Sequence, residues 1–151
     1  MALTPFETSY WKDFFTKLRP SYELPSRHQL GGPLLEAKHL RISEENREKI
    51  KNGEALGLMT DSYTNVRGES VIKIIITTPQ PVVFKYIFRG VNRETGAYIG
   101  EELCKVIREV GDAEKFWLLV TDNASNMKLA WDIVTQEFPH IQAIGCAAHC
   151  W

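Results

Sequence analysis

Apolar positions divide the chain into a helical first third and a strand-rich remainder. Before Gly53 they recur at the three- and four-residue intervals of an amphipathic helix, and after it they cluster in short runs. Thr4-Pro5-Phe6-Glu7 joins a capping residue to a first-turn proline and a following Glu, so we predict a helix over residues 5–18 whose aromatic stripe serves for packing. We expect a loop at 19–32, a short helix at 34–40, and a charged helix that begins at Ser43 and ends at Asn52-Gly53.

Beyond Gly53 the pattern predicts strands and then alternating helices and strands. Three β-rich runs come first, joined by short polar or proline-containing links, which is typical of an antiparallel meander. A helix that connects two later strands implies a right-handed parallel crossover. The fourth strand is an almost continuous apolar run, the pattern of a strand covered on both faces. The predicted strands lie at about 56–63, 70–78, 82–88, 116–121 and 141–148, and the predicted helices run from Ile99 to Val110 and from Met127 to Phe138.

This order of elements is the layout of the ribonuclease H-like fold, an α/β architecture with a mixed five-stranded sheet and helices on both faces. We therefore expect two parts: a helical lead-in over residues 1–53 and a ribonuclease H-like domain over residues 54–151 that is incomplete at its carboxyl end. The last residues, IGCAAHCW, stop directly after an apolar, strand-like stretch without a cap, turn or polar tail, which favours a truncated chain.

Composition narrows the class of protein without identifying a partner. The 151 residues are 44% hydrophobic and 11% aromatic, enough to bury a core. Lys and Arg number 18 against 19 Asp and Glu, so the chain lacks the overall basic field of many nucleic-acid-binding proteins, and any DNA contact must be local or supplied elsewhere. Three irregularly spaced cysteines fit a reducing compartment, and residues 1–20 lack the apolar run of a signal peptide or membrane span. We expect a nuclear or cytoplasmic protein with no membrane partner.

Asp61 and Asp122 are the strongest candidates for chemistry. Asp61 stands near the end of the first predicted strand and Asp122 at the end of the fourth, and in a ribonuclease H-like sheet these strands are parallel neighbours about 4.8 Å apart. Carboxylates at matching strand ends can face one site and supply the oxygen ligands that divalent ions need. The simpler alternative is that both residues open turns, with Asp122 or Asn123 capping the following helix.

Three segments, taken in order, resemble motifs of the hAT superfamily of transposases. MTDSYTNVRGESVI is similar to the first-aspartate motif, in which Asp is followed by an aromatic residue, Thr or Ser, and Asn or Arg. VTDNASNMKLA resembles the second-aspartate motif, and GCAAHC resembles the Cys-x-x-His segment of the fifth strand. FFTKLRPSYELPSRHQL is similar to the helical lead-in of such proteins, including the domain of unknown function found in plant and fungal members. The resemblance extends from about residue 10 to the end, and its specificity rests on the order of the motifs.

The resemblance implies that Asp61 and Asp122 are the first two catalytic acids, which bind Mg²⁺ or Mn²⁺ for DNA cleavage and strand transfer at transposon ends. The third acid of the family, a Glu, follows a long helical insertion that the sequence does not reach, so this chain is expected to be inactive alone. Cys146 and His149 match the Cys-x-x-His, a site element close to the carboxylates and the DNA end. Core burial is the alternative for this pair, and zinc fits poorly because a closed structural site needs four ligands.

Other polar and aromatic residues have simpler interpretations. Glu101 and Glu102 lie on the first helix of the sheet domain, where ribonucleases H carry a metal-binding acid, but a solvated helix face is the ordinary interpretation. Trp117 and Trp131 fit apolar stripes of the core. The basic residues of the meander could touch phosphate, although they do not cluster with aromatic residues for stacking. They are Arg67, Lys73, Lys85, Arg89 and Arg93.

Three functions from different classes remain open. The first is a hAT-like transposase core with an incomplete metal site. The second is a non-catalytic, transposase-derived module that binds DNA or protein, with self-association through apolar surface beside the fifth strand. The third is a compact nuclease that uses Asp61, Glu102 and Asp122, for which fold analogy is the main support.

Overall fold

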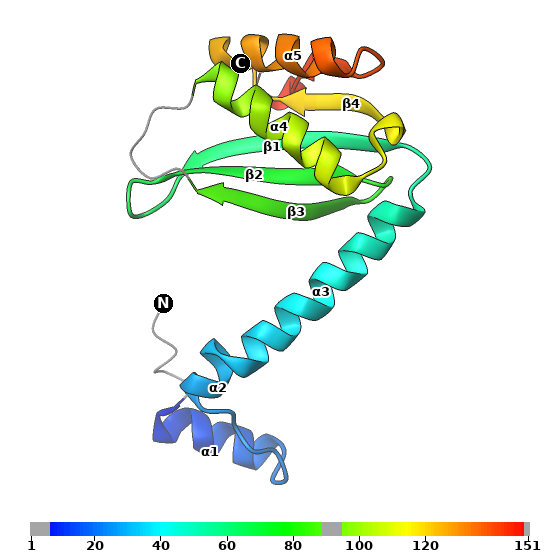
Figure 1. Cartoon of the computed structure of the whole chain (residues 1–151). Helices are drawn as coiled ribbons and strands as arrows, with labels where there is room; N and C mark the ends of the chain where they lie inside the picture. The colour runs from blue at the N-terminus through cyan, green and yellow to red at the C-terminus, as the bar shows by residue number, and fades with distance from the viewer. Residues whose placement is uncertain (1–6, 89–94, 150–151) are drawn as a thin grey trace. The chain divides into compact units, whose positions relative to one another are not determined.

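Two units share one long helix. Unit 1 comprises Met1–Glu45 and unit 2 comprises Asn46–Trp151, and helix α3 (Pro33–Asn52) contributes residues to both. The structure is a computed structural model that describes residues 7–88 and 95–149. None of the helices within those two ranges is long and apolar enough to cross a membrane. The other elements are α1 (Ser9–Leu18), α2 (Arg27–Gly31), β1 (Leu56–Thr64), β2 (Ser70–Thr77), β3 (Pro81–Phe88), α4 (Gly96–Val110), β4 (Phe116–Thr121), α5 (Ser125–Glu137) and β5 (Gln142–Gly145), with short 3-10 turns at Ala113–Lys115 and Ala147–His149 (Figure 1).

Unit 2 is built on one mixed sheet with the strand order β3-β2-β1-β4-β5. Strands β1, β2 and β3 form the predicted antiparallel meander, while β4 pairs in parallel with both β1 and β5. Strand β1 therefore lies at the centre of the sheet. Its parallel neighbour β4 comes later in the chain, after β2, β3 and α4. This mixed α/β architecture with flanking helices confirms the predicted fold class and is compatible with a ribonuclease H-like arrangement.

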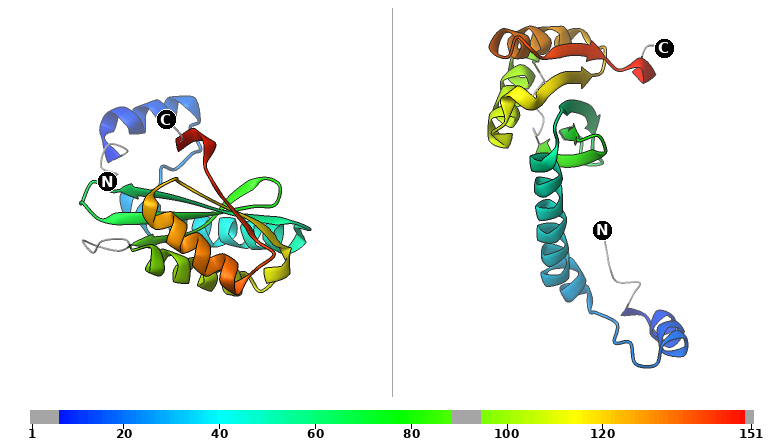
Figure 2. Two further views of the ribbon diagram at one scale, coloured as in Figure 1. Left: turned by 90° about the horizontal axis from the view of Figure 1, so that it is seen from above. Right: turned by 90° about the vertical axis from the view of Figure 1, so that its right-hand side faces the viewer.

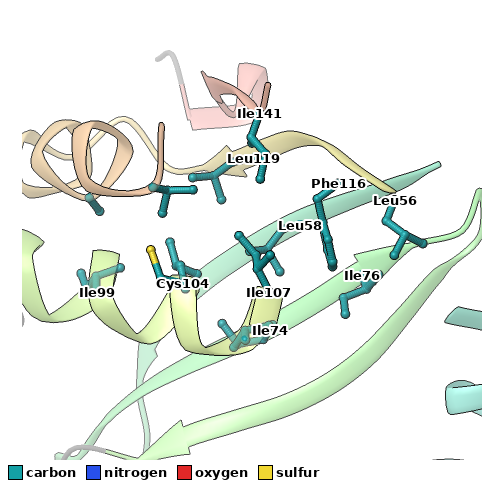
Figure 3. Packing of buried hydrophobic residues seen from close by; sticks show 14 of the residues in the cluster. Leu56, Leu58, Ile74, Ile76, Ile99, Cys104, Ile107, Phe116, Leu119 and Ile141 are labelled. Atoms are coloured by element: carbon teal, nitrogen blue, oxygen red, sulfur yellow. The ribbon is translucent and has the colours of Figure 1, made fainter. Parts of the chain in front are cut away.

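The core lies between one face of the sheet and the helices α4 and α5. Alternation along the strands directs Leu58 of β1 and Ile74 and Ile76 of β2 to this face, where they cluster with Ile107 of α4 (Figure 3). Both helices lie on the same side of the sheet, so the expectation of helices on both faces is wrong for α4 and α5 (Figure 2). The alternate residues of each strand consequently point to a second face that neither α4 nor α5 covers.

The two core helices pack closely because α4 carries glycines at the contact. A Cβ at Gly96 would collide with the backbone of α5, and one at Gly100 would press against Ile133. Arg108 of α4 and Glu137 of α5 pair at 2.5 Å across the same contact. Glycine is therefore needed at these two positions for close approach rather than for an unusual backbone conformation.

The strands and helices of unit 2 mostly lie where the sequence pattern predicts them. Gly111 ends α4 as expected, in the left-handed conformation with φ of 89°, and its N–H donates to the carbonyl of Ile107. Three expectations for the later strands are wrong. Strand β4 is covered on one face only, and Trp117, expected in the core, is 58% exposed at an irregularity in the β1–β4 pairing. The fifth strand spans Gln142–Gly145 rather than 141–148, because the chain turns into a 3-10 helix at Ala147.

The first third is more continuously helical than predicted. Helix α3 runs without interruption through the expected break before Ser43, since no Gly or Pro lies within it after Pro33, and Arg41 pairs with Glu45 one turn later at 2.8 Å. Helix α2 occupies part of the expected loop. Its start is a capping box in which Ser26 and Gln29 exchange side-chain and backbone hydrogen bonds.

Helix α1 begins at Ser9 rather than at residue 5. Thr4, Pro5 and Phe6, which suggested the earlier start, lie outside the described residues. Glu7 is used elsewhere, because its carboxylate accepts the backbone N–H of Arg27 at 3.0 Å. The aromatic stripe makes its contacts within the segment, and no residue of α1 is buried among the described residues. The rings in contact are those of Tyr10, Trp11, Phe14, Phe15 and Tyr22.

Candidate carboxylate site

Asp61 and Asp122 occupy corresponding positions on two neighbouring parallel strands. The pairing of β1 with β4 ends at Met59 and Val120, and each aspartate stands two residues farther along its chain segment. Asp61 is exposed near the end of β1, and Asp122 is half-buried directly after β4. Adjacent strands lie about 4.8 Å apart. Placement at the same end of adjacent strands is the geometry that a shared site requires.

Asp61 belongs to the face of the sheet that points away from the core. Alternation places it with Met59, and its direct neighbour on β2 is Lys73. The flanking residues Thr60 and Ser62 turn to the other side, where their hydroxyl oxygens are buried without a hydrogen-bond partner in the part of the chain that the structure describes. The carboxylate of Asp61 is thus the polar group that this part of β1 offers to solvent.

Asp122 opens the turn that leads into α5, as the simpler interpretation of the sequence proposes. Its Oδ1 accepts the backbone N–H of Ala124 at 2.9 Å, and Ala124 is the residue that precedes the helix. Directly before it, the buried Thr121 accepts the indole N–H of Trp131 at 2.9 Å. The expectation that Trp131 packs with the core therefore holds in part, since its ring packs against the core while its polar end ties α5 to the end of β4.

The second-aspartate motif and the Cys-x-x-His segment meet at the end of β5. The N–H of Cys146 donates to the carbonyl of Thr121 at 2.7 Å, and the side-chain amide of Asn123 donates to the carbonyl of Cys146 at 3.1 Å. A Cβ at Gly145 would collide with the Asn123 amide, so this glycine is needed for close approach. Cys146 itself is half-buried. His149 ends the 3-10 turn that follows, and its side chain lies outside the described residues.

The remaining sequence candidates do not join the two aspartates. Glu102 pairs with Lys105 of its own helix at 2.7 Å, and Glu101 is exposed. Within the described ranges, no group of three His, Cys, Asp or Glu side chains is placed to hold a metal ion. The arrangement therefore gives no support to the compact nuclease that would combine Glu102 with Asp61 and Asp122.

The basic residues of the meander differ from one another in their surroundings. Lys85 is engaged by Glu109 of α4 at 2.5 Å, whereas Lys73 is half-buried next to Asp61 on the open face of the sheet. Arg67 is exposed in the turn between β1 and β2. Arg89 and Arg93 lie outside the described residues. Of the described three, Lys73 is the cation placed beside the carboxylates.

Sequence reasoning missed the role of Asn65 and the aromatic surroundings of Lys73. Asn65 builds the β1–β2 turn, since its side-chain oxygen accepts the N–H groups of Arg67 and Glu69. Tyr86 of β3 is the direct neighbour of Lys73 across the sheet. An Asn before a Gly-containing turn signals the first feature, but the second depends on strand register, which the sequence does not state.

The fold and the placement of its carboxylates define a mixed α/β protein with two acids at the ends of adjacent parallel strands. The chain belongs to the family described as domain of unknown function (DUF659), whose family model matches residues 25–151. That range begins just before α2 and includes all of the sheet domain. The expected match to a domain of unknown function is thereby confirmed. No curated protein matches the chain.

Proposed function

We propose that the sheet domain is the front part of a hAT-like transposase core with a ribonuclease H-like fold, and that its site acts on the phosphodiesters of transposon DNA. The observation that carries the proposal is the common position of Asp61 and Asp122 at the ends of β1 and β4. The resemblance of MTDSYTN and VTDNASN to the two aspartate motifs supports it further. The proposed setting is the nucleus or cytoplasm, where reducing conditions keep cysteines such as Cys104 and Cys146 free.

The donor set of this site suits a hard cation. Mg²⁺ and Mn²⁺ prefer oxygen ligands, and Mg²⁺ keeps several waters while it accepts one or two carboxylates. Asp61 and Asp122 would hold such an ion, which supplies phosphate polarisation and activation of water or a 3′-hydroxyl when bound. Cys146 and His149 follow β5 at the same end of the sheet and would lie close to the DNA end.

We expect metal binding without DNA cleavage for residues 1–151. In-line attack on a phosphodiester normally requires two ions and further acids, and no third acid joins Asp61 and Asp122 among the described residues. The net charge of -1 also gives little non-specific attraction for phosphate. The lack of a third acid beside Asp61 and Asp122 among the described residues also favours the second candidate function. That function is a non-catalytic module that retains the fold to contact DNA or protein.

The proposed metal site predicts that Mn²⁺ binds weakly and that Asp61→Asn and Asp122→Asn each lower the affinity. Loss of one of two charged ligands weakens a site held by carboxylates, and asparagine at 122 can still accept the Ala124 N–H, so the turn should survive. Electron paramagnetic resonance of free and bound Mn²⁺ measures the effect. Asp132→Asn is the matched control, because Asp132 is an exposed aspartate on α5.

Two results would contradict this interpretation. Mn²⁺ binding that neither Asp61→Asn nor Asp122→Asn changes would remove the site. A metal-dependent nicking or strand-transfer assay in which the wild type cuts DNA and both variants fail would show a working nuclease, and the expectation of an incomplete site would be wrong.

A further inference from the structure

The sheet face opposite α4 and α5 carries exposed aromatic side chains beside Asp61. Strand pairing places Tyr63 of β1 opposite Val71 of β2, and Val71 opposite Phe88 of β3, so the three form one row on this face. Val71 is fully buried although it lies outside the core cluster, whereas Tyr63 is 47% and Phe88 67% exposed. Two large aromatic side chains thus flank a small buried one and remain accessible themselves.

The adjacent row on the same face combines an aromatic ring with opposite charges. Tyr86 of β3 lies opposite Lys73 of β2, which lies opposite Asp61 of β1. Tyr86 is 46% exposed and Lys73 is half-buried. Lys73 forms none of the ion pairs found in the described part of the chain. Its ammonium group is therefore available between the aromatic rings and the carboxylate.

A β-bulge brings these aromatic residues to the open face. Val82 of β3 is buried in the core, and plain alternation would place residues 84, 86 and 88 on the same side as Val82. The pairing of β2 with β3 shifts between Ile74 and Ile75, so that one extra residue of β3 is accommodated there. Beyond that point the even-numbered residues Tyr86 and Phe88 face away from the core.

We propose that Tyr63, Tyr86 and Phe88 form a stacking platform for unpaired nucleotides of a DNA strand whose phosphate backbone passes Lys73 and the two aspartates. This inference rests on the proposed function for the identity of the strand, and on the exposed rings for the mode of contact. Aromatic side chains on an open sheet stack bases without regard to sequence, because every base has a π-face. The strand must be unpaired, since bases in a duplex already stack on one another.

The charges in this region favour a nucleotide over an apolar protein segment. A protein that covered the rows would bury Lys73 and Asp61, and the centres of protein interfaces are depleted of Lys and Asp. An apolar partner is better suited to the next row across the sheet, which is aliphatic throughout. That row consists of Val83, Ile75, Met59, Val120 and Ile144.

The test is fluorescence anisotropy of a labelled oligo(dT) strand with the full chain in low salt and EDTA. Tyr63→Leu and Phe88→Leu keep apolar bulk but remove the ring, and each should weaken binding about fivefold or more, as expected for the loss of one stacked base. Tyr63→Phe keeps the ring and should bind like the wild type. Leu129→Ala on α5 is an exposed-residue control that should leave the affinity unchanged.

Every outcome decides the proposal. Loss of affinity in the leucine variants, with retention in Tyr63→Phe and unchanged melting temperatures, supports the platform. Absence of binding by the wild type overturns it, and so does equal binding by the leucine variants. A comparable loss in Leu129→Ala would show that the effect does not come from the platform, and it would also overturn the proposal. Because the assay contains EDTA, failure of the metal site would appear only in the Mn²⁺ titration, and the two failures are distinguishable.

Discussion

Cys104 illustrates at the scale of one residue how burial sets chemistry. The thiol lies on α4 in the core, and burial raises its pKa to about 11, with further contributions from the charge and hydrogen bonding of Glu137. The nearby Arg108, which pairs with Glu137, acts in the opposite direction. Cys104 therefore stays protonated in the folded chain at alkaline pH, where an ordinary thiol with a pKa of about 8.5 ionises.

This pKa shift predicts that the free energy of unfolding falls as the pH rises from about 8.5 toward 11. Over that interval the unfolded thiol releases its proton while the folded thiol retains it, so the unfolded state is favoured. Urea unfolding at a series of pH values should show a steeper decline for the wild type than for Cys104→Ala. Cys146→Ala, at a half-buried thiol with no such burial, is the control. Equal slopes for the wild type and Cys104→Ala would contradict the prediction.

At the scale of elements, the end of β5 depends on the contact between Gly145 and Asn123. Gly145→Ala should destabilise the fold by about 1–3 kcal/mol, because the added Cβ would collide with the Asn123 amide that holds the carbonyl of Cys146. Thermal or urea unfolding measures the change. In the background of Asn123→Ala the same substitution should cost less, because the obstructing amide is gone. Additive costs in this double-mutant cycle would show that the collision is relieved in another way.

The elements that the sequence predicts well are those whose signal is local. Periodicity and caps place α4, β4 and the meander strands within a few residues, since Gly111 and the polar links mark their ends. The first third is less accurate, because Ser43 can cap a helix but can also lie within one when no Gly or Pro interrupts the chain. The prediction for Trp117 is wrong for a related reason, since an apolar run does not reveal that one face of β4 lacks a covering helix.

For the candidate site, the sequence predicts which strands are neighbours but not how their residues pair. The adjacency of the strands that carry Asp61 and Asp122 follows from the order of elements and could be expected in advance. The grouping of Lys73 with Tyr63, Tyr86 and Phe88 could not, because it depends on the register of three strands and on the shift between Ile74 and Ile75.

At the scale of the whole molecule, the aliphatic row on the open sheet face predicts concentration-dependent self-association. Ile144 is 47% exposed, and it continues a row of apolar side chains that crosses all five strands. Contiguous apolar surface of this kind promotes association. Sedimentation velocity over a range of concentrations should show a larger species for the wild type than for Ile144→Lys.

The same substitution at Val66, which is fully exposed in the β1–β2 turn, is the control for added charge. Tyr10 and Leu18 of α1 are exposed as well, so they offer an alternative contact. Association that persists in Ile144→Lys would assign the contact to another surface, and a monomeric wild type at every concentration would contradict the prediction outright.

The extra residue in β3 reverses which residues of that strand face the open side of the sheet. Before the shift, odd-numbered residues of β3 belong to the open face, and after it even-numbered ones do. Without the bulge, the same residues of β3 would alternate strictly, so that Tyr86 and Phe88 would enter the core and Ile87 would emerge. Removal of Phe84 itself would restore a regular ladder and leave all three on their present faces. An extra residue in a turn changes only the length of a connection. The extra residue within β3 instead decides which side chains of the strand face solvent on the open side of the sheet.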